Sequence, residues 1–164
     1  MRIHSRLVLL SALSLICAPI PSFRAAAQWA APAPTSAYTV PNDHLIQPEE
    51  LNQLLHAKGG EKPLLFQVGS RMMFAQAHIP GSEFIGPGAQ NEGQANLRMR
   101  VANLPRATFI VLYCGCCPWS RCPNVGPAYQ LLHGMGFTRV KVLYLANNFG
   151  DDWVNKGFPV EGGR

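Results

Sequence analysis

Short apolar runs alternate with segments of mixed apolar and polar residues along most of the chain, from about residue 42 to the end. An apolar run of about 4 to 8 residues is typical of a strand buried on both faces of a sheet. The predicted strands are 45–46, 63–68, 82–85, 108–113 and 140–145. The predicted helices are 48–55, 70–77, 95–101, 124–135 and 151–156. Strands that alternate with helices predict an α/β domain, a small parallel sheet with helices on both faces.

Signals at the ends of several elements support this pattern. Pro48 stands at the start of a predicted helix, and acidic residues fill the first turn. Gly136 is placed to end the helix 124–135. The segment 78–81, His-Ile-Pro-Gly, predicts a turn, in which His78 is expected to be buried and bonded to the backbone. Trp153 is expected in the core.

The first 27 residues predict a signal peptide. Residues 1–6 are basic, residues 7–16 are apolar, and small residues precede a cleavage position near Ala27. Pro19 and Pro21 interrupt the apolar stretch, which is shorter than the roughly 20 residues of a membrane-spanning helix. We therefore predict a periplasmic or secreted protein that has no membrane association after cleavage.

The remaining sequence predicts a linker and one domain. Residues 28–41 are rich in Ala and Pro, which is typical of a linker, and residues 42–164 are predicted to form a single domain. Residues 28–164 contain all nine acidic residues and eleven of the fourteen Lys and Arg, so their net charge is +2. Because no basic patch is evident, we expect no nucleic-acid partner.

Four of the five cysteines follow the predicted strand 108–113 within nine residues, as Cys-Gly-Cys-Cys-Pro-Trp-Ser-Arg-Cys. Cys114 comes first, at a strand end that leads through a loop into a helix. Backbone N–H groups and the positive end of the helix dipole stabilise a thiolate at such a place. Arg121 adds a positive charge and is a candidate contact for an anion. Since ligands bind beyond the carboxyl ends of parallel strands, we predict that the chemistry takes place here.

Four features in this order make residues 44–160 similar to the rhodanese-like family. They are 64–68 before 74–81, the strand that ends in Tyr113-Cys114, 135–137 before 140–145, and the Trp-x-x-x-Gly-Phe-Pro-Val ending at 153–160. The resemblance implies a rhodanese-like fold and a persulfide-forming sulfurtransferase without a cofactor. In that family the cysteine at the position of Cys114 takes sulfur from a donor such as thiosulfate and passes it to cyanide or another thiol.

The sequence also departs from the family pattern. Gln67 and Gly69 stand where the family usually carries Asp and Arg, Met73 stands in place of Glu, and Asn147-Asn148 replace a glycine pair. The loop between Cys114 and the next helix is several residues longer than in the family, which normally has a single cysteine there. These differences bear on activity more than on the fold.

The cysteine cluster leaves several functions open. As a sulfur-transfer or redox site, it would use Cys114 as the nucleophile, and Cys122 or Cys117 would resolve it by forming a disulfide. A thiol reductase of the periplasm would then be a further partner. The reactive position could also be Cys116 or Cys117, because the spacing between Cys116 and Arg121 resembles the family's cysteine-to-arginine loop.

Two alternatives give the cysteines other roles. The four thiols could bind or deliver a soft metal, Cu(I) or Zn(II), through Cys114, Cys116, Cys117 and Cys122. They could instead form structural disulfides in a rhodanese-like module without activity. The sequence matches no standard zinc spacing, so we assign no metal.

Overall fold

The computed structural model describes residues 40–163, in which five strands form one sheet. The strands are β1 (Leu45–Ile46), β2 (Leu64–Gln67), β3 (Glu83–Phe84), β4 (Ile110–Tyr113) and β5 (Val140–Leu143). Their order in the sheet is β1-β5-β4-β2-β3, and every neighbouring pair is parallel. The predicted signal peptide, 1–27, and nearly all of the predicted linker lie outside the described residues.

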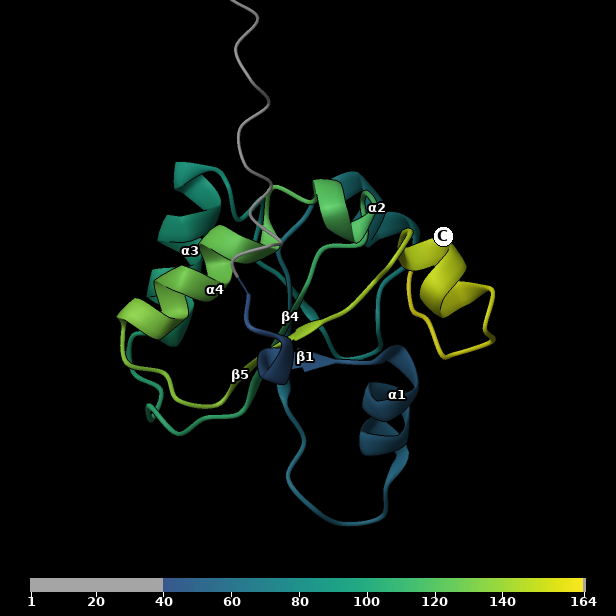
Figure 1. Ribbon diagram of the computed structural model, residues 1–164, viewed down its shortest axis with the longest axis horizontal. Coiled ribbons are helices and arrows are strands. Elements are labelled where there is room, and N and C mark those ends of the chain that lie inside the picture. The colour runs from purple at the N-terminus through teal and green to yellow at the C-terminus, as the bar shows by residue number, and fades with distance from the viewer. Residues whose placement is uncertain (1–39, 164) are drawn as a thin grey trace, which may run out of the picture. The chain divides into compact units, whose positions relative to one another are not determined.

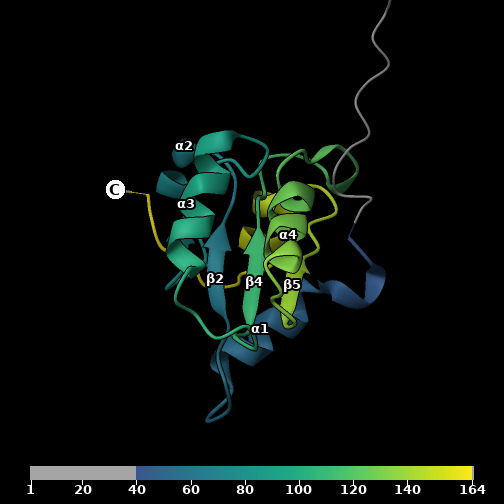
Figure 2. The same cartoon turned by 90° about the vertical axis from the view of Figure 1, so that its left-hand side faces the viewer.

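The helices lie on both faces of this sheet. They are α1 (Pro48–His56), α2 (Arg71–Gln76), α3 (Asn91–Val101) and α4 (Val125–Gly134), with 3-10 turns at Asn42–His44 and Trp119–Arg121 and a π turn at Gly150–Val154. In Figure 2, helices α3 and α4 lie in front of β2, β4 and β5, and α1 lies behind the sheet. Figure 1 shows the same arrangement from the side, with α3 and α4 on one side of the strands and α1 on the other. The predicted α/β fold with a parallel sheet is therefore confirmed.

Two apolar cores hold these layers together. The core on the α3 and α4 side includes Leu97, Leu132 and Phe66, and the core on the α1 side includes Leu51 and Trp153. All four residues of β4 are buried, because this central strand has a core on each face. The prediction that Trp153 lies in the core is confirmed.

Three boundaries differ from the sequence prediction. Helix α3 begins at Asn91 rather than 95, because Gly93 packs against the preceding loop: a Cβ at Gly93 would lie 2.2 Å from the Pro87 carbonyl oxygen. The last helix is the π turn over 150–154 rather than a helix over 151–156. Val40, assigned to the linker by its Ala/Pro-rich surroundings, is only 6 % exposed, because its side chain packs in the core of the domain.

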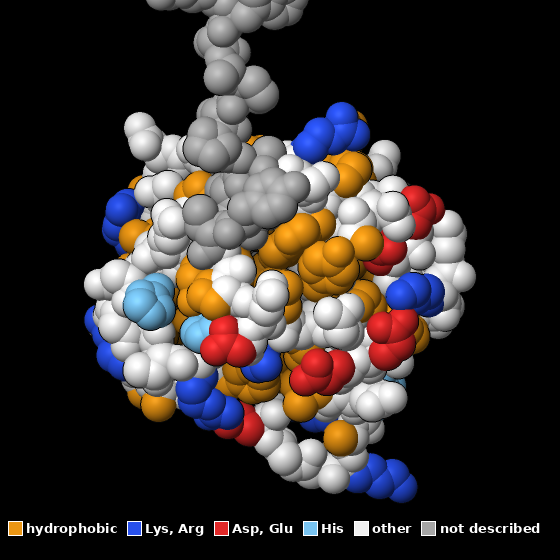
Figure 3. All heavy atoms as spheres, in the orientation of Figure 1, with side chains coloured by type: hydrophobic (Ala, Val, Ile, Leu, Met, Phe, Trp, Pro, Cys, Tyr) orange, Lys and Arg blue, Asp and Glu red, His pale blue; other side chains and the backbone are white. Residues whose placement is uncertain are grey.

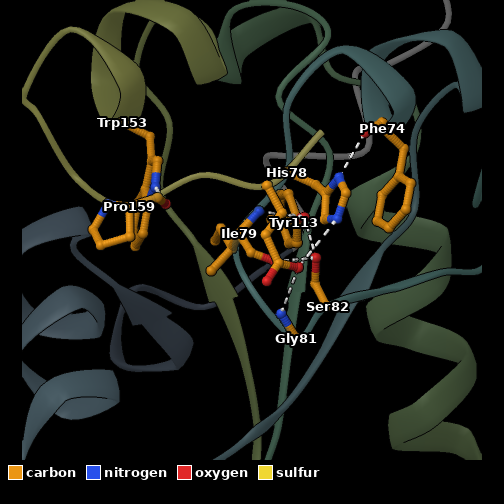
Figure 4. A network of polar contacts seen from close by, with 9 residues as sticks. Phe74, His78, Ile79, Gly81, Ser82, Tyr113, Trp153 and Pro159 are labelled. Atoms are coloured by element: carbon orange, nitrogen blue, oxygen red, sulfur yellow. Dashed lines mark hydrogen bonds and ion pairs between the residues drawn. The ribbon is translucent and has the colours of Figure 1, made fainter. Parts of the chain in front are cut away.

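The His-Ile-Pro-Gly turn is tied to the strand that ends at the cysteines (Figure 4). The Ile79 N–H donates to the Tyr113 hydroxyl at 3.2 Å, and the Ser82 hydroxyl donates to the Ile79 carbonyl at 2.6 Å. Because the one hydroxyl hydrogen of Ser82 is used there, Tyr113 donates its own to Ser82, at 2.7 Å. Burial raises the pKa of Tyr113 to about 12. The residue directly before Cys114 is thus held in place as a neutral hydroxyl.

His78 contacts the backbone as predicted, but it is half-buried rather than buried. Its Nδ1 lies 2.7 Å from the Phe74 carbonyl oxygen, and its ring stacks on that of Phe74 with 3.9 Å between centroids. On its other side, Nε2 lies 3.7 Å from the Glu161 carboxylate, and the backbones of the two residues form an antiparallel bridge. His78 therefore fastens the end of the chain to the loop after α2.

The surface carries charges of both signs. On the face shown in Figure 3, Lys and Arg side chains are interspersed with Asp and Glu. Within residues 40–163, no helix is both long and apolar enough to cross a bilayer.

Candidate functional site

The four clustered cysteines lie at the carboxyl edge of the sheet and differ in exposure. Cys114 directly follows β4 and is 4 % exposed, and Cys122, just before α4, is 3 % exposed. Cys116 is exposed and Cys117 is half-buried. A reagent in solution therefore meets Cys116 first, and Cys117 next.

Three of the sulfurs form a continuous row. Cys114 Sγ lies 3.1 Å from Cys116 Sγ, which lies 3.4 Å from Cys117 Sγ. The Cys117 thiol in turn donates to the Arg121 carbonyl oxygen at 3.7 Å. Gly115 permits this row, because its φ of +74° turns the chain sharply between Cys114 and Cys116.

Asn124 is a site residue that sequence reasoning missed. Its side chain is 7 % exposed, and its Nδ2 donates to Cys114 Sγ at 3.4 Å and reaches Cys116 Sγ at 3.9 Å. The amide is oriented by Ala89, whose N–H donates to Asn124 Oδ1 at 3.2 Å. Asn at a helix start suggests only a cap, but here it makes no cap bond and instead points its donor at the sulfurs. No pattern within the sequence signals this contact.

Two departures from the family pattern lie against Cys114. Gln67, at the end of β2, is 2 % exposed and donates from Nε2 to the Cys114 carbonyl oxygen at 3.2 Å, while its Oε1 accepts from the Gly69 N–H at 3.1 Å. A Cβ at Gly69 would lie 3.0 Å from Cys114 Sγ. Gln67 thus braces the strand end, and Gly69 leaves room for the sulfur.

The loop after β5 holds the cysteine loop from the opposite side. The Phe149 N–H donates to the Gly115 carbonyl oxygen at 3.0 Å, and the Trp119 N–H donates to the Ala146 carbonyl oxygen at 3.1 Å. The backbone N–H groups of Asn147 and Asn148 donate to a carboxylate, that of the buried Asp152, at 2.6 and 3.1 Å. The Asn147 and Asn148 side-chain amides also donate, to the carboxylates of Asp152 and Asp151 at 3.2 and 2.7 Å, so the asparagine pair that replaces the family's glycines closes a loop that supports the site.

The pKa is shifted in opposite directions in the two thiols that lie closest together, Cys114 and Cys116. The Cys114 S–H, which donates to Cys116, lowers the pKa of Cys116 to about 6, with further help from Cys117 and Asn124. The same contact, with those to Cys117 and Cys122 and with burial, raises the pKa of Cys114 well above its ordinary value. Neighbouring thiols cannot all ionise, so Cys114, which is buried and interacts with the other three thiols, keeps its proton.

Cys122 is the thiol that the helix start favours. The interaction with Cys114, with the backbone N–H groups of Asn124 and Val125, lowers the pKa of Cys122 to about 7. This lowered pKa agrees with the sequence prediction that the helix start favours a thiolate at Cys122. The expectation of a low pKa for Cys114 is wrong, because the lengthened loop brings other sulfurs, which accept its proton, next to it.

Arg121 contacts the row of sulfurs through its backbone carbonyl oxygen and not through its charged group. Arg121 is exposed, and no carboxylate within residues 40–163 pairs with its guanidinium group. A void of about 10 Å³, bordered by Cys114, Cys122 and Trp119, is no larger than a single water needs. A substrate must therefore approach from the exposed side.

No group of three or more His, Cys, Asp or Glu in the described part of the chain is arranged to hold a metal ion.

A pH profile tests the exposed thiolate. We expect alkylation of Cys116 by iodoacetamide to rise with pH and to be half-maximal at about pH 6, since the thiolate is the reactive form and is populated above the pKa. An ordinary thiol would instead be half-maximal near about pH 8.5. Peptide mapping after short labelling measures the rate. Cys116→Ser should remove the reaction at low pH, and a midpoint near that of an ordinary thiol in the parent chain would contradict the prediction.

The sequence model of one family, described as the rhodanese-like domain, matches residues 47–146. The chain belongs to the rhodanese-like domain family. A search of curated proteins finds no significant match.

Solved structures show the same fold. The BH2092 protein from Bacillus halodurans is 24% identical to this chain with a TM-score of 0.56, and the match covers 73% of this chain and 77% of the BH2092 chain. The rhodanese-like domain of the Alr3790 protein from Anabaena sp. is 22% identical with a TM-score of 0.53, covering 73% and 79%. The thiosulfate sulfurtransferase from Pseudomonas aeruginosa is 20% identical with a TM-score of 0.55, covering 79% of this chain but 22% of its own.

In this rhodanese-like domain the structure brings the predicted thiols together. Cys114, Cys116 and Cys117 are in sulfur–sulfur contact, and Cys122 lies beside Cys114. Arg121 is linked to them through its carbonyl oxygen, not through its charged group. The roles of these residues in a reaction stay predictions.

Proposed function

We propose that this rhodanese-like chain is an exported sulfurtransferase, or carrier of sulfane sulfur, that uses a cysteine persulfide. The observation that carries the proposal is the exposed Cys116 sulfur, which accepts hydrogen bonds from Cys114 and from Asn124. Sulfur transfer requires a stable thiolate within reach of solvent and donors for the anion that it becomes. The basic and apolar pattern of residues 1–27 supports export.

We assign the attacking sulfur to Cys116 and a supporting role to Cys114, the nucleophile expected from the family pattern. Thiosulfate is a suitable donor, as the name of the Pseudomonas aeruginosa protein illustrates. The Cys116 thiolate attacks the outer sulfur of thiosulfate, a sulfur–sulfur bond forms to Cys116, and sulfite leaves with the electron pair of the broken bond. A thiol or cyanide then takes the outer sulfur from Cys116. The exposed Arg121 can attract the anionic donor.

Intact-mass spectrometry of serine variants tests this assignment. After reduction and addition of thiosulfate, Cys114→Ser should gain the mass of one sulfur atom and lose it on addition of cyanide. Cys116→Ser should gain none, because it lacks the accessible thiolate. The reverse result would assign the nucleophile to Cys114. A stably retained metal ion, or no sulfur uptake in any form of the protein, would contradict the proposed function.

A further inference from the structure

The sulfurs of Cys114 and Cys116 are close enough to react with each other. They lie 3.1 Å apart, and a disulfide bond is about 2.0 Å long, so a movement of about 1 Å joins them. Gly115 holds the turn between them, since a Cβ there would lie 2.6 Å from the Cβ of Phe149. The packing of Phe149 thus keeps the two cysteines in this arrangement.

We propose that Cys114 resolves the persulfide: its sulfur attacks the Cys116 sulfur, forms a Cys114–Cys116 disulfide and releases the outer sulfur as hydrogen sulfide. This inference rests on the proposed function, because it needs a persulfide at Cys116. In the step, Cys114 Sγ bonds to Cys116 Sγ and the bond from Cys116 to the outer sulfur breaks. The outer sulfur leaves with that electron pair and takes the proton of Cys114, so the persulfide anion and the thiol yield a disulfide and HS⁻.

The contacts explain why Cys114 reacts only after sulfur has been loaded. In the resting site, Cys116 is the first cause of the raised pKa of Cys114, because its sulfur accepts the Cys114 proton. When Cys116 carries a second sulfur, the negative charge moves to the outer atom. Cys114 then loses that acceptor but keeps the Asn124 amide, which donates to its sulfur at 3.4 Å. The loss of the acceptor, together with the retained Asn124 donor, favours the Cys114 thiolate.

The neighbouring thiols are less suited to this step. A disulfide between the adjacent Cys116 and Cys117 is strained, and the Cys117 thiol is engaged with the Arg121 carbonyl oxygen. Cys122 interacts first with Cys114, the thiol that itself lies 3.1 Å from Cys116. Cys114 is therefore the resolving thiol that the geometry favours.

The product disulfide must be reduced before another cycle. Because Cys116 is exposed, an external dithiol can attack its sulfur and restore both thiols, becoming oxidised to a disulfide itself. Over the whole cycle, the two electrons of the dithiol reduce one sulfane sulfur to sulfide. The domain would then supply sulfide at the expense of a dithiol, in addition to passing sulfur to cyanide.

A single-turnover experiment tests the inference. The full chain is reduced, freed of reductant and mixed with thiosulfate alone, and free sulfide and intact mass are measured together. We expect stoichiometric sulfide and a protein lighter by two hydrogen atoms, with a disulfide mapped between Cys114 and Cys116. Cys114→Ser, whose hydroxyl can still donate to Cys116, should keep a cyanide-labile sulfur and release no sulfide. Cys117→Ser should still release sulfide and still form the disulfide.

The outcomes separate this inference from the proposed function. A persulfide that persists in the parent chain, or sulfide release from Cys114→Ser at the rate of the parent chain, would overturn the attack by Cys114 but leave persulfide formation intact. Sulfide release that is lost in Cys117→Ser instead would assign the resolving role to Cys117. If neither the parent chain nor Cys114→Ser takes up sulfur, the proposed function itself fails.

Discussion

Asn124→Asp is expected to lower the reactivity of Cys116 by about 5- to 500-fold near pH 6, since a carboxylate within about 4–6 Å of another acid raises its pKa by roughly 1–3 units. The Asn124 amide now donates to Cys114 Sγ at 3.4 Å and to Cys116 Sγ at 3.9 Å. Aspartate has nearly the same shape, and one of its oxygens can still accept the Ala89 N–H. The other oxygen replaces a donor by a negative charge beside the sulfurs.

The measurement is the pH profile of iodoacetamide labelling at Cys116, with sulfur uptake from thiosulfate followed in parallel. We expect the midpoint of labelling to move upward from about pH 6. Asn96→Asp is a matched control, because it makes the same chemical change on α3, where the Asn96 amide donates to the Ile85 carbonyl oxygen. If the two variants label alike, the Asn124 amide does not set the reactivity of Cys116.

Trp153→Ala is expected to destabilise the domain by about 3–5 kcal/mol, which is the usual cost of removing a buried Trp side chain. Trp153 has no exposed surface, and its Nε1 donates to the Pro159 carbonyl oxygen at 2.8 Å. Its ring lies 6.1 Å from that of Phe149 and 5.0 Å from that of Phe158. Since Phe149 packs on Gly115, the cavity left by Trp153→Ala would also loosen the support of the cysteine loop.

Urea unfolding followed by circular dichroism measures the loss as a lower midpoint. Trp153→Phe is the control, because it keeps an aromatic ring but removes the hydrogen bond to Pro159. We expect it to cost about 1–3 kcal/mol, mainly for the carbonyl left without its donor. A loss below about 1 kcal/mol in Trp153→Ala would show that Trp153 is not the anchor that its burial indicates.

The fold could be predicted because its signals are local. The apolar run before Cys114 can be satisfied only by a strand with a core on each face, and β4 occupies that position. The starts of α1 and α2 and the turn after α2 also follow from residues next to each other in the sequence. The start of α3 could not be predicted, because it depends on Gly93 packing against Pro87, a contact that outweighs the low helix propensity of glycine.

The sequence predicts where the site lies in the sheet, but not how its side chains are arranged. The sequence alone determined that the thiols follow a buried strand, since a parallel strand must end at the edge where ligands bind. Only the tertiary structure decided which sulfur is exposed and which keeps its proton. That depends on contacts from elements distant in the chain: Gln67 from β2, Asn124 from the start of α4 and Phe149 after β5. Because a thiol's pKa is set by its burial and by the donors around it, composition and spacing do not contain the answer.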